Sequence, residues 1–179
     1  MNKPRLIIFE GHDQTGKDTL INYIKEKNPS FYLYKQKTSE EQGVDYRDKE
    51  KYEAWLYSYI KNQIEELKEI SKNNDTIIMT RLIISDNVYS DCFGRNHIVE
   101  PNFKEDIYSF FDVKTITILW KNYEQYLQRV KMSGGYIQYD CTEFYRIKEL
   151  YEKYSSKEDT IYITNDLSTE EIYNILFNG

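Results

Sequence analysis

The chain has 179 residues and a formal net charge of -6. That length is enough for one domain with a full hydrophobic core and too short for two, so we expect a single domain over 1–179. A general nucleic-acid-binding protein needs a basic surface to displace counterions, so polynucleotides are not expected partners. No apolar run approaches the ~20 residues that cross a bilayer, and no signal peptide is visible. We therefore expect a cytoplasmic protein without a membrane partner.

The predicted elements alternate between buried strands and amphipathic helices. Arg5–Glu10 is a short apolar run typical of a strand buried on both faces of a parallel sheet, and a helix is expected over Asp18–Lys27. Phe31–Tyr34 is a candidate second strand, and a long amphipathic helix follows over 50–72. Further strands are expected at 75–80, 115–120 and 160–164, and further helices around 123–130, 144–154 and 168–176. This alternation predicts an α/β domain with a five-stranded, mostly parallel sheet flanked by helices in three layers.

A glycine-containing loop follows the first predicted strand. Its residues, Gly11-His12-Asp13-Gln14-Thr15-Gly16-Lys17-Asp18-Thr19, have the GxxxxGK spacing between a strand and a helix that a P-loop requires. Such a loop turns successive backbone N–H groups inward, the helix start adds a positive dipole end, and Lys17 supplies a charge for the β and γ phosphates. The fold is therefore expected to be of the P-loop NTPase type. ATP is the expected ligand, bound by Gly11, Asp13, Gln14, Thr15, Gly16, Lys17, Asp18 and Thr19.

The residue after the P-loop lysine departs from the strict motif, which has Ser or Thr there. Asp18 occupies this position, and a carboxylate can either ligate Mg²⁺, directly or through water, or stabilise the helix N-terminus. Glu10, just before the loop, is a second candidate that would position magnesium-bound water or act as a structural hydrogen-bond acceptor. ATP and Mg²⁺ are therefore the expected cofactors.

The stretch from Phe9 to Thr19 resembles the FEGxDxxGKxT signature of thymidylate kinases. Arg81, Ser85 and Tyr89 resemble that family's DRYxxSxxAY stretch, in which the Arg grips the monophosphate. Residues 127–134 and 144–151 resemble the family's LID and the helix behind it, which implies a LID at about 131–141. The resemblance covers nearly the whole chain, at low identity outside the P-loop, and implies transfer of the γ-phosphoryl group of ATP to dTMP. The GKDT variant also resembles phage deoxynucleoside monophosphate kinases, so dTMP is not expected to be the only acceptor and another dNMP stays open.

The resemblance implies a role for each acceptor-site residue. Asp13 would receive the sugar 3′-hydroxyl, and Arg81 would hold the acceptor phosphate with Ser85 and Tyr89 beside it. In the long helix over 50–72, Tyr57 would stack on the base and Lys61 would meet its edge, because positions i and i+4 share one helix face. The alternative without a role in binding is that the Tyr57 side chain belongs to the core and the Lys61 side chain to the solvated surface.

Three departures from the family pattern concern charge. Thr80 stands where the family has Asp, while Gln14 and Tyr136 stand where members place a P-loop or LID arginine. The cation that stabilises the transferred group is then expected from Arg129 or Lys131, with Arg95 as a weaker candidate. The expected catalytic residues are Lys17, Arg81, Arg129 and Lys131. The two histidines, His12 and His97, are expected in surface or capping roles.

Two other functions remain open from the sequence. A deoxynucleoside kinase shares the fold but phosphorylates a 5′-hydroxyl, and it needs a carboxylate base after the second strand, where Glu40 and Glu41 are the candidates. A nucleotide-binding regulator without catalysis is the other alternative. It is suggested because Thr80 stands where the family has a carboxylate, and Gln14 and Tyr136 stand where its members have an arginine. A small-molecule nucleotide is the expected partner in each case. A homodimer is compatible with the sequence, which does not fix the oligomeric state.

Overall fold

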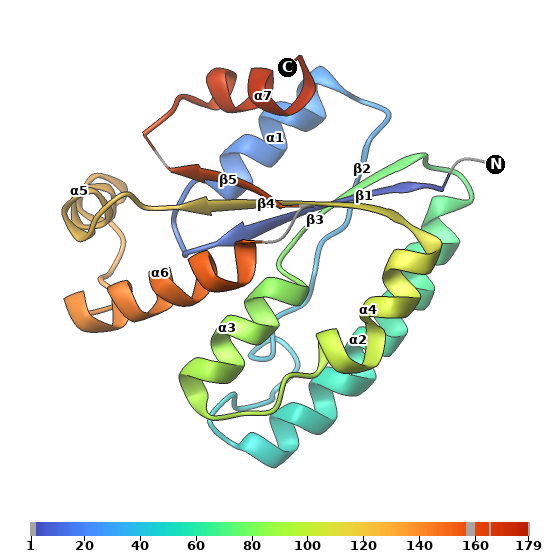
Figure 1. Ribbon diagram of the computed structural model, residues 1–179, viewed down its shortest axis with the longest axis horizontal. Coiled ribbons are helices and arrows are strands. Elements are labelled where there is room, and N and C mark those ends of the chain that lie inside the picture. Colours follow the sequence, from blue (N-terminus) through green and yellow to red (C-terminus); the bar gives the residue numbers. More distant parts are fainter. Residues whose placement is uncertain (1–2, 157–159, 165, 179) are drawn as a thin grey trace.

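The computed structural model describes residues 3–156, 160–164 and 166–178, in which a five-stranded sheet lies between two layers of helices (Figure 1). The strands are β1 (Arg5–Gly11), β2 (Tyr32–Leu33), β3 (Thr76–Thr80), β4 (Asp112–Leu119) and β5 (Thr160–Thr164). They are ordered β2-β3-β1-β4-β5, and every pairing is parallel. The predicted α/β class and five-stranded sheet are confirmed. No helix in the described part of the chain is long and apolar enough to cross a membrane.

Helices cover both faces of the sheet (Figure 1). On one face lie α1 (Lys17–Lys27) and α7 (Thr169–Phe177), and on the other lie α2 (Lys49–Ser71), α3 (Ile83–Phe93), α4 (Val99–Phe110) and α6 (Cys141–Ser155). The remaining helix, α5 (Tyr123–Ser133), follows β4 and lies beyond its carboxyl end. This arrangement brings the loop after β1, the start of α3 and the α5–α6 connection to the same edge of the sheet.

The buried residues of β1 show why the sheet needs cover on both faces. Leu6 and Ile8 pack in one apolar cluster with α2, α3 and α4, whereas Ile7 and Phe9 pack in a second cluster with α1 and α7. Successive strand residues point to opposite faces, so a continuous apolar run fills two cores at once. A third cluster joins α3, α5 and α6 around the fully buried ring of Phe144. These cores fix the helices whose ends carry the polar residues of the site.

The structure differs from the sequence expectations at three places. β4 begins at Asp112 rather than 115, because it pairs along the whole of β1 from Arg5 onward. β2 is reduced to Tyr32–Leu33 at the edge of the sheet, where only β3 pairs with it. Two helices, α3 and α4, occupy 83–93 and 99–110, a stretch to which the sequence assigned no element.

Candidate active site

The P-loop owes its shape to backbone positions that few residues tolerate. Gly11 has a φ of +125°, and a Cβ on it would lie 1.9 Å from the backbone oxygen of Ile118 on β4. Gln14 has a positive φ of 61°, which is uncommon outside glycine, and Gly16 has a φ of +85° directly before α1. The chain therefore curls between β1 and α1 at a fixed place on the sheet. Strained backbone of this kind concentrates at functional sites.

Lys17 is buried inside this loop. Its ammonium donates to the backbone oxygens of Gly11, at 3.2 Å, and His12, and it lies 3.3 Å from the hydroxyl oxygen of Thr15. Burial and, to a smaller extent, the nearby Arg81 guanidinium lower the pKa of Lys17 to about 7. A phosphate group inside the loop would place a negative charge next to this ammonium and so favour its charged form.

Arg81 lies immediately after β3 and joins the P-loop through an ion pair with Asp13. It has a φ of 54°, and its backbone N–H donates to the Phe9 oxygen at 2.8 Å, so the main chain holds it against β1. The Asp13 carboxylate also accepts from the Tyr139 hydroxyl, which belongs to the α5–α6 connection. Burial raises the pKa of Asp13, but Arg81 and Tyr139 outweigh it and hold this pKa below its ordinary value. Asp13 therefore links the P-loop, the end of β3 and the predicted LID.

The guanidinium of Arg81 also lies 5.5 Å from the ring centre of Tyr89 on α3, and the Tyr89 hydroxyl is 3.4 Å from that of Tyr139. Burial acts to lower the pKa of Arg81, but Tyr89, Tyr151 and Asp13 together raise it well above its ordinary value. Arg81 is thus a permanent cation with aromatic walls. The structure brings together three of the predicted site residues here: Asp13, Arg81 and Tyr89.

Glu10 faces the start of α3 rather than the P-loop lysine. Its carboxylate accepts from the backbone N–H groups of Leu82 at 2.8 Å and of Ile84 and Ser85 at 3.2 Å each, and from the Ser85 hydroxyl. Burial raises the pKa of Glu10, although these hydrogen bonds oppose the shift. Both of its oxygens are engaged in capping the helix. The geometry favours the structural alternative for Glu10 over a role with magnesium.

Tyr57 lies on the side of α2 that packs against α4, and Lys61 follows one turn later on the same face. The Tyr57 ring contacts Phe103 of α4, with ring centres 5.0 Å apart, and both Tyr57 and Lys61 are exposed. Two residues further on, the Tyr59 hydroxyl accepts from the backbone N–H of Lys37 at 2.9 Å. Positions two apart on a helix lie about 200° apart around its axis, so these two tyrosines occupy opposite sides.

The predicted LID segment lies against the P-loop. Gln14 Nε2 donates to the backbone oxygen of Tyr136 at 3.5 Å, and the Tyr139 hydroxyl reaches Asp13 as described above. The two candidate cations, Arg129 and Lys131, are exposed on α5 shortly before this segment. Neither makes an ion pair with any residue that the structure describes. Because positions two apart on a helix lie about 200° apart around its axis, only one of them can face an anion bound between the LID and the P-loop.

Arg95 is a poor substitute for that cation. It follows α3, whose eleven residues span about 16 Å at 1.5 Å each, whereas Arg81 precedes the same helix. Its guanidinium stacks 4.0 Å from the Tyr52 ring centre, at the far end of the helix from the P-loop.

The histidines differ in environment. His12, expected at the surface or in a cap, is instead fully buried and stacks on Phe144 with ring centres 4.6 Å apart. Burial lowers the pKa of His12 to about 4, so the ring is neutral at physiological pH and packs as a core aromatic. His97 lies 2.7 Å from an Asp91 oxygen in a partly exposed contact.

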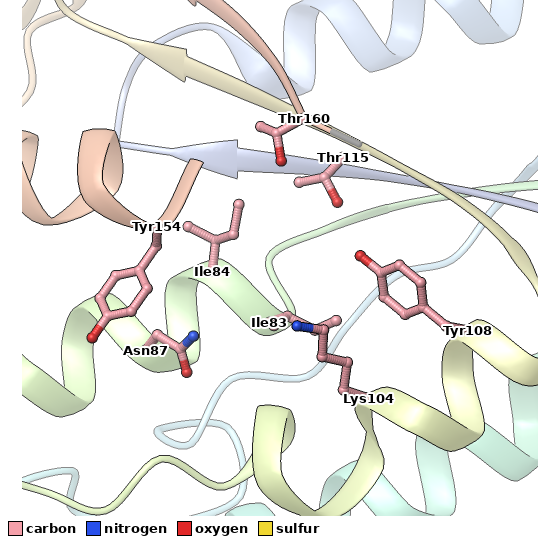
Figure 2. Close-up of a pocket in the computed structure, with 8 residues that line it drawn as sticks. All are labelled: Ile83, Ile84, Asn87, Lys104, Tyr108, Thr115, Tyr154 and Thr160. Carbon is pink, nitrogen blue, oxygen red and sulfur yellow. The ribbon is translucent and has the colours of Figure 1, made fainter. Parts of the chain in front are cut away.

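Two of the cavities among the described residues lie outside the P-loop. The smaller, of about 80 Å³, lies between α3, α4 and the sheet, and Tyr154, Lys104 and Tyr108 are among its lining residues (Figure 2). It is too small for a nucleotide. The larger, of about 420 Å³, lies between the edge strand β2, the segment after it and α2, and it includes the buried amide of Gln63.

No cluster of three or more acidic, histidine or cysteine side chains in the described residues could hold a metal ion without help from a ligand. Asp18 is exposed at the start of α1, next to Lys17. One carboxylate together with phosphate oxygens is the usual arrangement for Mg²⁺ bound with a nucleotide. The residues present therefore fit a magnesium ion that arrives with the triphosphate.

Comparison with solved structures relates this fold to nucleoside and nucleotide kinases. A deoxyadenosine kinase from M. mycoides, with the products dCMP and a flexible dCDP bound, matches with a TM-score of 0.63 at 17% identity, over 97% of each chain. The YorR protein of Bacillus subtilis, in complex with phosphorylated GDP, matches with a TM-score of 0.65 at 20% identity, over 97% of this chain and 94% of that protein. Thymidylate kinase from Candida albicans matches with a TM-score of 0.60 at 14% identity, over 98% and 92%. Neither a protein-family model nor a curated protein matches the sequence.

At these identities the likeness establishes the fold alone, which this chain shares with a deoxyadenosine kinase, the YorR protein and a thymidylate kinase. The predicted three-layer fold of the P-loop type is confirmed. Sequence reasoning missed two residues that the structure brings into the site. Tyr139 lies 126 positions from Asp13, and Gln36 donates to the Arg81 backbone oxygen at 2.8 Å from a predicted loop in which the sequence pointed only to Glu40 and Glu41.

Proposed function

We propose that the protein is an ATP-dependent nucleoside monophosphate kinase that transfers the γ-phosphoryl group of ATP to dTMP or another deoxynucleoside monophosphate. The observation that carries the proposal is the position of Arg81, a permanent cation tied to the P-loop residue Asp13 at the carboxyl end of β3. Open α/β sheets bind ligands at this edge, and a guanidinium has five N–H groups, enough to pair with Asp13 and a phosphate together. An acceptor phosphate held there would lie next to a triphosphate in the P-loop.

The chemistry asks little of the protein beyond charge and position. A phosphate monoester is mostly dianionic near neutral pH, since its second pKa is about 6, so no general base is required. Lys17 would neutralise the β and γ phosphates, and Arg81 would orient the acceptor. Arg129 or Lys131 would add positive charge as the LID segment excludes water. When bound, Mg²⁺ would neutralise further phosphate charge, with Asp18 as the protein ligand.

A nucleoside acceptor fits the site less well. Its 5′-hydroxyl needs a carboxylate base near the end of β2, and the residue that contacts Arg81 there is Gln36, whose amide cannot take up a proton. Glu40 is exposed, and Glu41 accepts from the Thr38 backbone N–H at 2.7 Å within a local turn. The chain therefore favours an acceptor that brings its own ionised oxygen.

A coupled ADP-release assay over the common deoxynucleosides and their monophosphates tests the proposal. We expect ADP release with one or more monophosphates and none with nucleosides, and no release from the Lys17→Met variant in either case. Release with nucleosides alone would establish the nucleoside kinase instead. ATP binding with no release from any acceptor would indicate the non-catalytic regulator.

A further inference from the structure

The charges around the phosphate loop cancel one another. Asp13 and Arg81 form an ion pair, so the guanidinium next to the loop is already matched by a carboxylate. Lys17 is buried inside the loop, and the acidic residue Asp18 follows it directly in the first turn of α1. The loop and Arg81 together therefore present no excess of positive charge to a triphosphate.

Asp18 is the charged member of this set that has no partner. Its side chain is exposed, and its carboxylate forms no hydrogen bond or ion pair with any residue in the described part of the chain. The start of a helix after a glycine loop is where phosphate groups bind, so this carboxylate lies beside the place that a triphosphate would take. The other carboxylate near the loop, that of Glu10, is engaged at the start of α3.

A free carboxylate at this place acts with opposite sign on a bare and on a metal-bound triphosphate. It repels the bare nucleotide, because both carry negative charge. It attracts the metal-bound one, because Mg²⁺ takes carboxylate and phosphate oxygens as ligands together. A serine or threonine hydroxyl, which the strict motif has at this position, can ligate the metal but has no charge with which to repel the bare nucleotide.

We infer that Asp18 makes the nucleotide site selective for the metal-bound form of ATP, because its carboxylate repels a bare triphosphate and holds the divalent cation of a complexed one. Since the loop has no excess of positive charge, the cation itself must offset much of the phosphate charge. The inference rests on the proposed function for ATP as the ligand, and it is independent of the acceptor.

Calorimetric titration of the protein with ATP, in the absence of any acceptor, tests this inference. Each protein is titrated once with an excess of Mg²⁺ and once with EDTA, and the ratio of the two dissociation constants is compared between variants. For the wild type we expect ATP with EDTA to bind at least about 100-fold more weakly than ATP with Mg²⁺. A general loss of stability affects both titrations alike and cancels from the ratio.

Two substitutions at the same position separate the two actions of the carboxylate. Asp18→Asn removes the charge at nearly constant size, so ATP with EDTA should bind about tenfold more tightly than to the wild type and ATP with Mg²⁺ about tenfold more weakly. Asp18→Thr restores the hydroxyl of the strict motif. ATP with EDTA should again bind about tenfold more tightly, and ATP with Mg²⁺ should keep its affinity to within about threefold.

Glu26→Gln is the matched control, because it removes an exposed carboxylate that lies eight positions further along α1, about 12 Å along the helix axis. It should change neither dissociation constant.

The outcomes distinguish this inference from the proposed function. An unchanged ratio in Asp18→Asn, or a shift of both constants in the same direction, would overturn the inference and leave the proposed acceptor untouched; a carboxylate that only stabilises the start of α1 gives this result. Equal affinities of the wild type with Mg²⁺ and with EDTA would overturn it as well. The expected ratios without ADP release from any acceptor would support the role of Asp18 and overturn the proposed kinase. No binding of ATP in either form would overturn both.

Discussion

The buried P-loop lysine should make ATP binding depend on pH. The pKa of Lys17 is about 7 in the free protein, mainly because burial disfavours its charged form. A triphosphate favours the charged form, so binding draws a proton onto Lys17 whenever the free lysine is neutral. With a bound pKa well above 9, the fraction of charged free lysine falls from about one half at pH 7 to about one tenth at pH 8. ATP affinity should therefore fall roughly eightfold between pH 7.5 and pH 8.5.

Calorimetry in buffers of different ionisation enthalpy measures this proton directly. Near pH 8 the wild type should take up about 0.9 proton for each ATP bound, and the Lys17→Met variant should take up none. ATP itself is fully ionised in this range, so it does not contribute. Equal proton uptake by both proteins, or an affinity independent of pH, would refute the lysine assignment.

The same titration acts on stability with the opposite sign. A lysine whose pKa is lowered on folding binds a proton when the protein unfolds, so the unfolded state holds more protons between pH 7 and pH 10. The contribution of Lys17 to the free energy of unfolding should therefore rise with pH by up to about 1.4 kcal/mol per unit. The free protein gains stability over the pH range in which it loses ATP affinity.

Three further predictions follow from the geometry of the site. Arg81→Ala should raise the KM of the monophosphate by about 10- to 100-fold and that of ATP much less, since a charged hydrogen bond contributes about 1.5–3 kcal/mol. Steady-state kinetics with each substrate varied in turn measures both KM values, and an equal rise in the two would contradict this prediction. Arg129→Ala or Lys131→Ala should lower kcat by about 10²- to 10³-fold with little change in KM, and retention of more than half of kcat by both variants would remove these cations from the mechanism. Gly11→Ala should lower the free energy of unfolding, measured with denaturant, by more than about 3 kcal/mol, because the new Cβ would lie 1.9 Å from a backbone oxygen. Gly43 also has a positive φ but has open space around it, so Gly43→Ala should lower this free energy by only about 1 kcal/mol. Equal losses in the two variants would contradict the steric argument.

The strands and the phosphate loop could be predicted because their signals are local. Arg5–Gly11 is an apolar run that ends in a glycine, and Lys17 follows at the required spacing. The start of α3 was not predictable in this way, because its first residues have no capping side chain of their own. The acceptor for its N–H groups is the Glu10 carboxylate, more than 70 positions earlier in the chain. A cap supplied by tertiary structure leaves no pattern within the helix sequence.

The helix α2 shows a second limit of sequence reasoning. Helical spacing identifies pairs that share a face, such as Tyr57 with Lys61 or Tyr59 with Gln63. It does not show which of these two faces of α2 packs against the segment after β2 and which packs against α4. Both pairs combine an aromatic ring with a polar end, so the sequence fits either equally well. The choice depends on how α2 is rotated against the sheet, and the buried Ile60 fixes that rotation.

The costly features of this protein gather near one edge of its sheet. Gln14 and Arg81 hold positive φ values there, and Lys17 is buried with a lowered pKa. A buried lysine with a lowered pKa does not stabilise the ligand-free fold, and an anion bound beside Lys17 would favour its charged form. The proposed binding of a triphosphate in the loop would therefore offset this cost, which gives a physical reason for a buried lysine at this place.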